Sequence, residues 1–246
     1  MNMIEVKNLV KDYGKFRAVN DVSFSVAEGE IFGFLGINGA GKTTTLSILA
    51  GTLAQSSGSV SIAGWDIQKN PREAKALTGY IPDRPYVYEK LSAREYLYFL
   101  ADLYQVDSSL IEPRIDKLLK EFGLQKWQNE LIESFSHGMR QRIATCGALI
   151  HDPAVLIIDE PMVGLDPHGA KLLKDSMKNL AEQGKSIFLS THSLNVAEEV
   201  ADRLAIIDHG TIIALGTIEE IQAGLGIQAS GLENLFLQLT SNIYQH

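Results

Sequence analysis

Cysteine, long apolar runs and basic charge are all scarce in this sequence. A single cysteine, Cys146, excludes a disulfide within the chain and fits a reducing compartment. The longest stretch without a charged residue, 43–65, is rich in Thr, Ser and Gly. A membrane-spanning helix needs about 20 mostly apolar residues. We therefore expect a chain that does not cross a membrane itself and reaches one only through a partner.

The charge balance is acidic, with 22 Lys and Arg against 30 Asp and Glu and a net charge of −8. Proteins that bind nucleic acid usually do so with clustered basic residues. Because this chain is acidic, we expect no nucleic-acid partner. The first residues carry charges and no apolar run, which predicts no signal peptide. A length of 246 residues, 45% of them hydrophobic, allows one large α/β domain with an inserted subdomain.

Short apolar runs predict the buried strands of a parallel sheet, and we place them at 31–35, 155–158, 187–189 and 204–207. The first three runs are each followed by residues that could take part in binding or catalysis: Gly36, then Asp159 and Glu160, then Thr191 and His192. Open α/β sheets bind their ligands beyond the carboxyl ends of parallel strands. These residues are therefore expected to converge on one site.

Other segments predict two additions to this α/β core. Alternating apolar residues in 22–26 and 59–62 favour a small antiparallel β subdomain. Residues 84–150 read as an inserted α-helical subdomain. There, Ser92 and Glu95 form a capping box that opens a helix through Tyr104, and a second amphipathic stretch ends before Gly123.

The last part of the chain, 217–246, is expected to be a short helical end. Thr217 and Glu220 form a second capping box. It follows an Asp-His-Gly turn at 208–210, which is typical of a hairpin.

A glycine-rich loop at 36–43 matches the pattern G-x-x-x-x-G-K-[ST] in full, between a predicted strand and a helix-compatible run. Its main-chain N–H groups can ring phosphate oxygens at the positive end of a helix. Lys42 supplies a cation for the phosphates, and the Thr43 hydroxyl can bind Mg²⁺. The predicted nucleotide-binding residues here are Gly36, Ile37, Asn38, Gly39, Ala40, Gly41, Lys42, Thr43 and Thr44. The alternative, a glycine-rich turn with a solvated lysine, is disfavoured by the strand and helix that flank the loop.

Two acids follow the second apolar run. Mg²⁺ prefers oxygen ligands, so Asp159 is suited to hold the magnesium shell. Glu160 is suited to polarise a water that attacks the terminal phosphate. On their own these residues fit a strand that ends in two solvated acids equally well. Beside the phosphate loop they predict hydrolysis of ATP with Mg²⁺.

With these motifs the chain resembles, over nearly its whole length, the ATP-binding subunit of ABC transporters. The resemblance includes a P-loop NTPase fold, with 1–246 as a single ABC ATPase domain. It implies a signature at Ser136, His137, Gly138 and Met139 and a D-loop at Gly164 to Pro167 that contains Asp166. It also implies that His192 is a catalytic switch residue that contacts the terminal phosphate, although a histidine at a strand end is usually structural. Tyr13 stands where the family stacks an aromatic ring on adenine.

The family pairs two such subunits head to tail, so each signature contacts the ATP of the opposite subunit. A helix N-terminus at Ser136 and Gly138 is physically suited to an anion, although without the resemblance an ordinary N-cap is the favoured explanation of Ser136. Three positions depart from the family pattern. His137 replaces a glycine, Met162 replaces a small polar residue, and Asp83 stands where glutamine is usual, keeping an oxygen for the metal but adding negative charge.

These features predict an ATPase that dimerises, as a homodimer or a heterodimer, and powers a separate polytopic membrane chain. The C-terminal segment 231–240 resembles the ends of ABC-2 or export-type members, so we expect an exporter. The expected location is cytoplasmic, on the inner face of the membrane.

A soluble ATPase that acts on a cluster-assembly scaffold is the alternative. A DNA-maintenance role is disfavoured, because only about 90 residues separate Lys42 from Ser136 and leave no room for a long coiled coil.

Overall fold

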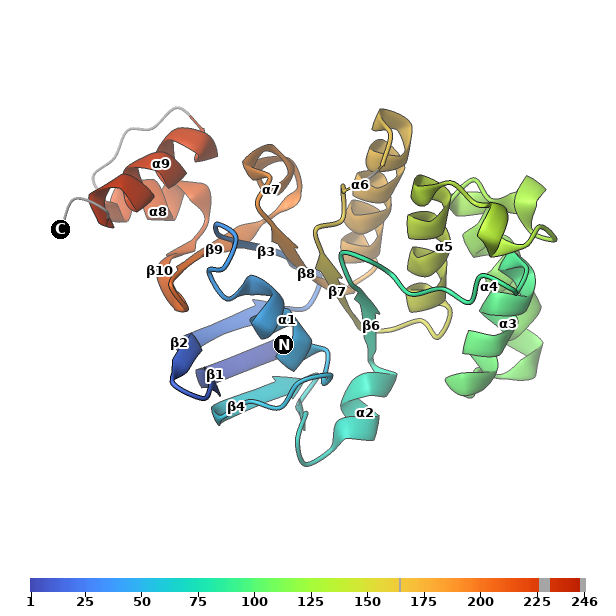
Figure 1. Cartoon of the computed structure of the whole chain (residues 1–246), viewed down its shortest axis with the longest axis horizontal. Helices are drawn as coiled ribbons and strands as arrows, with labels where there is room; N and C mark the ends of the chain where they lie inside the picture. Colours follow the sequence, from blue (N-terminus) through green and yellow to red (C-terminus); the bar gives the residue numbers. More distant parts are fainter. Residues whose placement is uncertain (164, 226–230, 244–246) are drawn as a thin grey trace.

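Two β-sheets organise the chain in this computed structural model, which describes residues 1–163, 165–225 and 231–243 (Figure 1). The larger sheet has six strands in the order β10-β9-β3-β8-β7-β6. In that order the strands are Thr211–Gly216, Arg203–Asp208, Ile31–Leu35, Ser186–Thr191, Val155–Asp159 and Thr78–Ile81. All neighbours pair in parallel except β10, which returns antiparallel to β9.

All four predicted parallel strands are confirmed, as β3, β7, β8 and β9. The turn at 208–210 joins β9 to β10 as a hairpin, with His209 at φ 44° and Gly210 at φ 80°. The edge strand β6 was not predicted, and β10 was implied only by the predicted hairpin turn. The carboxyl ends of β3, β7 and β8 therefore lie side by side at one edge of the sheet.

The smaller sheet is antiparallel, in the order β2-β1-β4-β5. Its strands are Phe16–Ala27, Asn2–Tyr13, Ser57–Ile62 and Trp65–Asp66. It contains both alternating segments that the sequence singles out, 22–26 and 59–62. The antiparallel β subdomain is thereby confirmed, with β1 as an additional central strand.

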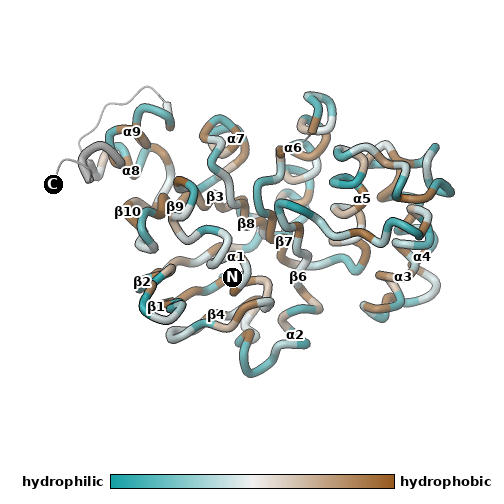
Figure 2. The backbone as a smooth tube through the Cα atoms, viewed as in Figure 1, coloured by the Kyte–Doolittle hydropathy of each residue, from teal (hydrophilic) through white to brown (hydrophobic). Residues whose placement is uncertain are grey.

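A cluster of phenylalanines joins the two sheets. Phe32 and Phe34 point to the same side of β3, where they meet Phe188 of β8 and Phe24 of β2. Their ring centroids lie 5.3 to 5.8 Å apart, a favourable range for aromatic pairs. Figure 2 shows the hydrophobic stretches that run through these central strands. This packing fixes β2, and the hairpin that leads into it, against the parallel sheet.

The opposite face of the parallel sheet is covered by helices. On β7, Leu156 and Ile158 share a buried cluster with Leu97, Leu119 and Ile143 from the helices of the 84–150 segment. These helical elements are α3, α4, η1, η2 and α5, at Ala93–Leu103, Ser108–Glu121, Gln125–Trp127, Ile132–Ser134 and His137–Leu149. Burial on both faces explains why the strands read as continuous apolar runs.

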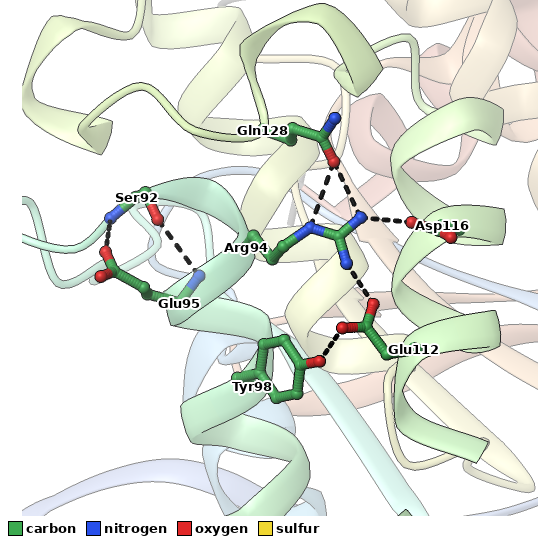
Figure 3. A network of polar contacts seen from close by, with 7 residues as sticks. All are labelled: Ser92, Arg94, Glu95, Tyr98, Glu112, Asp116 and Gln128. Atoms are coloured by element: carbon green, nitrogen blue, oxygen red, sulfur yellow. Dashed lines mark hydrogen bonds and ion pairs between the residues drawn. The ribbon is translucent and has the colours of Figure 1, made fainter. Parts of the chain in front are cut away.

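The predicted helix boundaries in this segment are confirmed. Ser92 caps α3 by accepting a hydrogen bond from the Glu95 N–H, and the Glu95 carboxylate accepts one from the Ser92 N–H (Figure 3). Helix α4 ends at Glu121, and Gly123 then adopts φ +65°.

Cys146 lies fully buried in α5, where burial raises the pKa of its thiol. It is a packed core thiol.

Arg94 connects these helices through ion pairs and hydrogen bonds. Arg94 of α3 pairs with Glu112 and Asp116 of α4, and its guanidinium also donates to the Gln128 side chain at 2.8 and 3.1 Å (Figure 3). The Tyr98 hydroxyl donates to the second oxygen of Glu112. The network connects α3 to α4 and to the turn after η1.

The remaining helices are α1, α2, α6, α7, α8 and α9, at Lys42–Leu49, Pro71–Ala76, Pro167–Glu182, Leu194–Val200, Ile218–Leu225 and Leu232–Ile243. The capping box at Thr217 and Glu220 is present at the start of α8. Helices α8 and α9 lie at the end of the molecule opposite α3 and α4 (Figure 1). Residues 226–230 and 244–246, part of the predicted helical end, lie outside the described residues. Within the described ranges, no helix is both long and apolar enough to span a bilayer.

Candidate functional site

The glycine-rich loop leaves the end of β3 and turns directly into α1. A Cβ atom on Gly36 would lie 2.5 Å from the Ile207 carbonyl oxygen. Gly41 adopts φ +106°, and a Cβ there would lie 2.5 Å from the Ala18 carbonyl oxygen. Only glycine fits these two positions without moving backbone. The loop thus presents its main chain at the N-terminus of α1, where the helix dipole attracts anions.

The loop is supported from behind by the β9–β10 hairpin. The Gly210 N–H donates to the Ala40 carbonyl at 2.9 Å, and the Gly210 carbonyl accepts from the Asn20 N–H at 2.8 Å. The hairpin therefore connects the loop to β2 of the small sheet. The sequence predicts the turn but gives no sign of this supporting contact.

Lys42, the first residue of α1, is 6% exposed. Its ammonium donates to the Gly36 carbonyl at 2.7 Å and to the Ile37 carbonyl at 3.2 Å. Burial lowers the pKa of Lys42, and the nearby negative charges of Glu160 and Asp159 oppose that effect. A poorly hydrated cation favours binding of an anion such as phosphate, whereas the two nearby acids oppose it.

Asp159 ends β7 and is 3% exposed. It accepts a hydrogen bond from the Ser190 hydroxyl of β8 at 2.9 Å, and its carboxylate also hydrogen-bonds the Thr43 side chain. Burial raises the pKa of Asp159, and the charges of Glu160 and Asp83 raise it further. A divalent cation would relieve this concentration of negative charge. The donors here are a hydroxyl and carboxylates, the oxygen ligands that Mg²⁺ prefers.

Glu160 follows at φ +48°, a backbone conformation that is uncommon for residues other than glycine. Its N–H donates to the Ser190 carbonyl at 2.9 Å. Its carboxylate accepts from the Thr191 hydroxyl at 3.1 Å and from the His192 N–H at 3.0 Å, and lies 2.7 Å from Nδ1 of His192. The end of β8 therefore holds this acid in one orientation.

These groups surround a pocket of about 370 Å³. It is lined by Tyr13, Phe16, Ala18, Asn38, Gly39, Gly41, Lys42, Thr43, Thr44, Asp83, Asp159 and Glu160. The structure thus brings together most of the residues predicted to bind nucleotide or metal. Gly36, Ile37 and Ala40 belong to the same loop but do not line the pocket, and His192 is connected to the pocket through its contact with Glu160. Phe16 and Ala18 were not predicted.

The residues of the predicted signature lie elsewhere, at the N-terminus of α5. Ser136 caps that helix by accepting a hydrogen bond from the Met139 N–H at 3.3 Å. Ser136 and His137 are exposed, Gly138 and Met139 are half-buried, and none of the four lines the pocket. The N-terminus of α5 is therefore separate from the pocket that the phosphate loop lines.

Asp166 caps α6 by accepting a hydrogen bond from the Gly169 N–H at 2.7 Å. Gly164, the first residue of the predicted D-loop, lies outside the described residues. Asp166 is exposed and does not line the pocket. Its observed contacts are those of a helix cap.

This chain is similar to known proteins of one family. The ABC transporter family profile matches residues 19–163. The linearmycin resistance ATP-binding protein LnrL of Bacillus subtilis is 36% identical over 241 residues, covering 96% of this chain and 78% of LnrL. The ABC-type transporter ATP-binding protein EcsA of the same organism is 34% identical over 246 residues, covering all of both chains.

Solved structures show the same fold. An ATP-binding subunit of an ABC transporter superposes with a TM-score of 0.92 at 34% identity, covering 97% of this chain and 99% of that one. CbiO1 of Clostridium perfringens, part of the ABC transporter complex cbiONQ, gives 0.80 at 26% identity, covering 90% and 91%. The fold is therefore that of an α/β P-loop NTPase, and the chain belongs to the ABC transporter family as an ATP-binding subunit that hydrolyses ATP.

Proposed function

We propose that ATP binds with its phosphates on the loop 36–44 and its adenine against Tyr13. The observation that carries this proposal is the convergence of Tyr13, Lys42, Asp159 and Glu160 on one pocket at the carboxyl edge of the sheet. In this arrangement Lys42 exchanges its contacts with two loop carbonyls for contacts with phosphate oxygens. The adjacent main-chain N–H groups bind the remaining phosphate oxygens.

Mg²⁺ fits the oxygen donors at this edge. Thr43 and Asp159 would hold it, with Asp83 as an outer ligand through water, and when bound it neutralises negative charge on the phosphates. Glu160 then accepts a proton from the attacking water, and His192 keeps the Glu160 carboxylate oriented toward the terminal phosphate. The hydrogen bonds from Thr191 and His192 support this positioning role.

We further propose that ATP joins two subunits head to tail. Ser136, His137, Gly138 and Met139 of one copy would contact the terminal phosphate held by the other copy. The N-terminus of α5 is partly exposed and lies outside the pocket of its own chain, which supports this arrangement. Asp166 would lie near the interface between the two subunits.

In this proposal the whole chain acts as one ATPase domain, with 84–150 as its helical subdomain and 217–246 as a C-terminal end. The dimer drives a separate polytopic membrane chain from the cytoplasmic face of the membrane. Export is the proposed direction. It is supported by the relatives, one of which is named for resistance to linearmycin. The partner would be identified by purifying the tagged subunit from membranes.

Dimerisation tests the proposal directly. Glu160→Gln should bind ATP without turning it over, so a dimer should accumulate in ATP and Mg²⁺ and be visible as a doubled mass by light scattering. The same variant carrying Gly138→Asp should stay monomeric, because a carboxylate at the α5 N-terminus repels phosphate. A monomer in both samples, or a dimer in both, would contradict the head-to-tail arrangement.

A further inference from the structure

Tyr13 and Phe16 face each other across a tight turn. They are directly opposed in the β1–β2 ladder, with only Gly14 and Lys15 between them. Gly14 takes φ +61°, which lets the chain reverse in two residues. Directly opposed residues of an antiparallel pair point to the same face of the sheet. Both rings therefore stand on one side of the hairpin, and both line the nucleotide pocket.

These two rings are largely exposed in the absence of a ligand. Phe16 is 64% exposed and Tyr13 is 48% exposed, and Phe16 is absent from the buried clusters that hold the two sheets together. Leaving a phenylalanine in water forgoes the free energy that its burial would provide. An incoming flat and apolar surface would bury it. The pocket position of Phe16 places that surface beside the phosphate loop.

The surroundings hold the hairpin in place before any ligand arrives. The Lys11 ammonium lies over the Tyr13 ring, 5.1 Å from its centroid, and donates to the Ala54 carbonyl at 2.8 Å. Next to Phe16, Arg17 forms an ion pair with Asp12, with 2.8 Å between Nε and Oδ1. Lys11 and Arg17 are therefore paired with groups other than the phenylalanine ring. The ring remains available for an apolar contact.

We infer that Phe16 is a second aromatic wall for the nucleobase and acts together with Tyr13. Two rings on one face offer more stacking surface to a two-ring purine than to a one-ring pyrimidine. Phe16 is thus a specificity residue that favours purine over pyrimidine triphosphates. This inference rests on the proposed nucleotide site and adds to it a residue that reads the base.

The experiment compares ATP, CTP and tripolyphosphate by isothermal titration calorimetry without divalent cations, so that no hydrolysis occurs. Stacking of a base on an aromatic side chain contributes enough that its loss weakens binding at least about fivefold. Phe16→Ala should therefore weaken ATP binding by at least about fivefold and CTP binding by less. Binding of tripolyphosphate, which has no base, should stay within about twofold of wild type.

Two further variants separate a base contact from a general effect on the hairpin. Phe16→Tyr keeps the ring and should restore ATP affinity, whereas Phe16→Leu keeps apolar bulk without a ring and should behave like Phe16→Ala. Trp65→Ala is the matched control. It removes an aromatic ring that is 42% exposed on the same small sheet but does not line the pocket.

Unchanged ATP affinity in Phe16→Ala, an equal loss for tripolyphosphate, or an equal loss in Trp65→Ala would overturn the role of Phe16. Wild-type protein that binds neither ATP nor tripolyphosphate would instead refute the proposed nucleotide site, and the role of Phe16 with it.

Discussion

At the scale of single residues, Asp159 is the group whose environment most constrains the chemistry. It is buried at the end of β7, and the hydroxyl of Ser190 gives it a hydrogen bond at 2.9 Å. Burial raises the pKa of Asp159, whereas this hydrogen bond lowers it. Ser190 therefore helps to keep Asp159 ionised and correctly oriented for a cation.

Ser190→Ala should weaken the response to Mg²⁺ more than the binding of ATP. Loss of a hydrogen bond that orients a metal ligand typically costs at least about tenfold in metal affinity or activity. We expect the Mg²⁺ concentration for half-maximal ATPase activity to rise by about tenfold. Ser186→Ala is the control, since Ser186 is buried in the same strand but donates to the Ala27 carbonyl. Equal Mg²⁺ curves for wild type and Ser190→Ala would remove Ser190 from this role.

At the scale of elements, the junction between α5 and β7 depends on a neutral histidine. His151 stacks on Tyr104, with ring centroids 3.8 Å apart, and its Nε2 donates to the Thr78 carbonyl at 3.2 Å. Its Nδ1 is buried without a hydrogen-bond partner among the described residues. Burial lowers the pKa of His151 from 6.5 to about 4. A proton on Nδ1 would leave a buried charge without a partner.

This histidine should make folding stability depend on pH. Between about pH 6.5 and pH 4 the unfolded chain binds a proton that the folded chain does not. The contribution of neutral His151 is therefore complete above pH 6.5 and is lost as the pH falls toward 4. Because water partly screens the half-buried ring, we expect about 1–2 kcal/mol of unfolding free energy over this range.

Denaturant unfolding at pH 7 and pH 5 measures the effect. His151→Gln keeps a donor for the Thr78 carbonyl but does not titrate, so it should flatten the slope of stability against pH. The carboxylates that also lose stabilising contacts in acid are common to both proteins and cancel in the comparison. Equal slopes for wild type and His151→Gln would show that folding does not lower the pKa of His151.

Some of the elements could be predicted from local sequence patterns, and others could not. Capping boxes at Ser92 and Thr217 are local, involve residues three apart, and could be placed correctly from the sequence. The strand β6 could not, because Thr78–Ile81 is short and contains a glycine. Its place at the sheet edge follows from pairing with β7, which is a tertiary contact.

At the scale of the whole molecule, the site is assembled from segments far apart in the chain. The phosphate loop and the acid pair were predictable because each follows an apolar strand, and the parallel register brings those strand ends together. Phe16 was not predictable from spacing alone, because its role depends on the β1–β2 register and on the phenylalanine cluster that docks β2. The support of Ala40 by Gly210 is equally nonlocal.

The central claim is that Lys42 binds the phosphates while Glu160 activates the water. One measurement tests both halves: ATP affinity and ATP turnover of Glu160→Gln and Lys42→Ala beside wild type. Glu160→Gln should keep ATP affinity and lose at least about 100-fold in turnover, because general base catalysis contributes on that order. Lys42→Ala should lose affinity and turnover together. Wild-type turnover in Glu160→Gln, or wild-type affinity with full turnover in Lys42→Ala, would contradict the account.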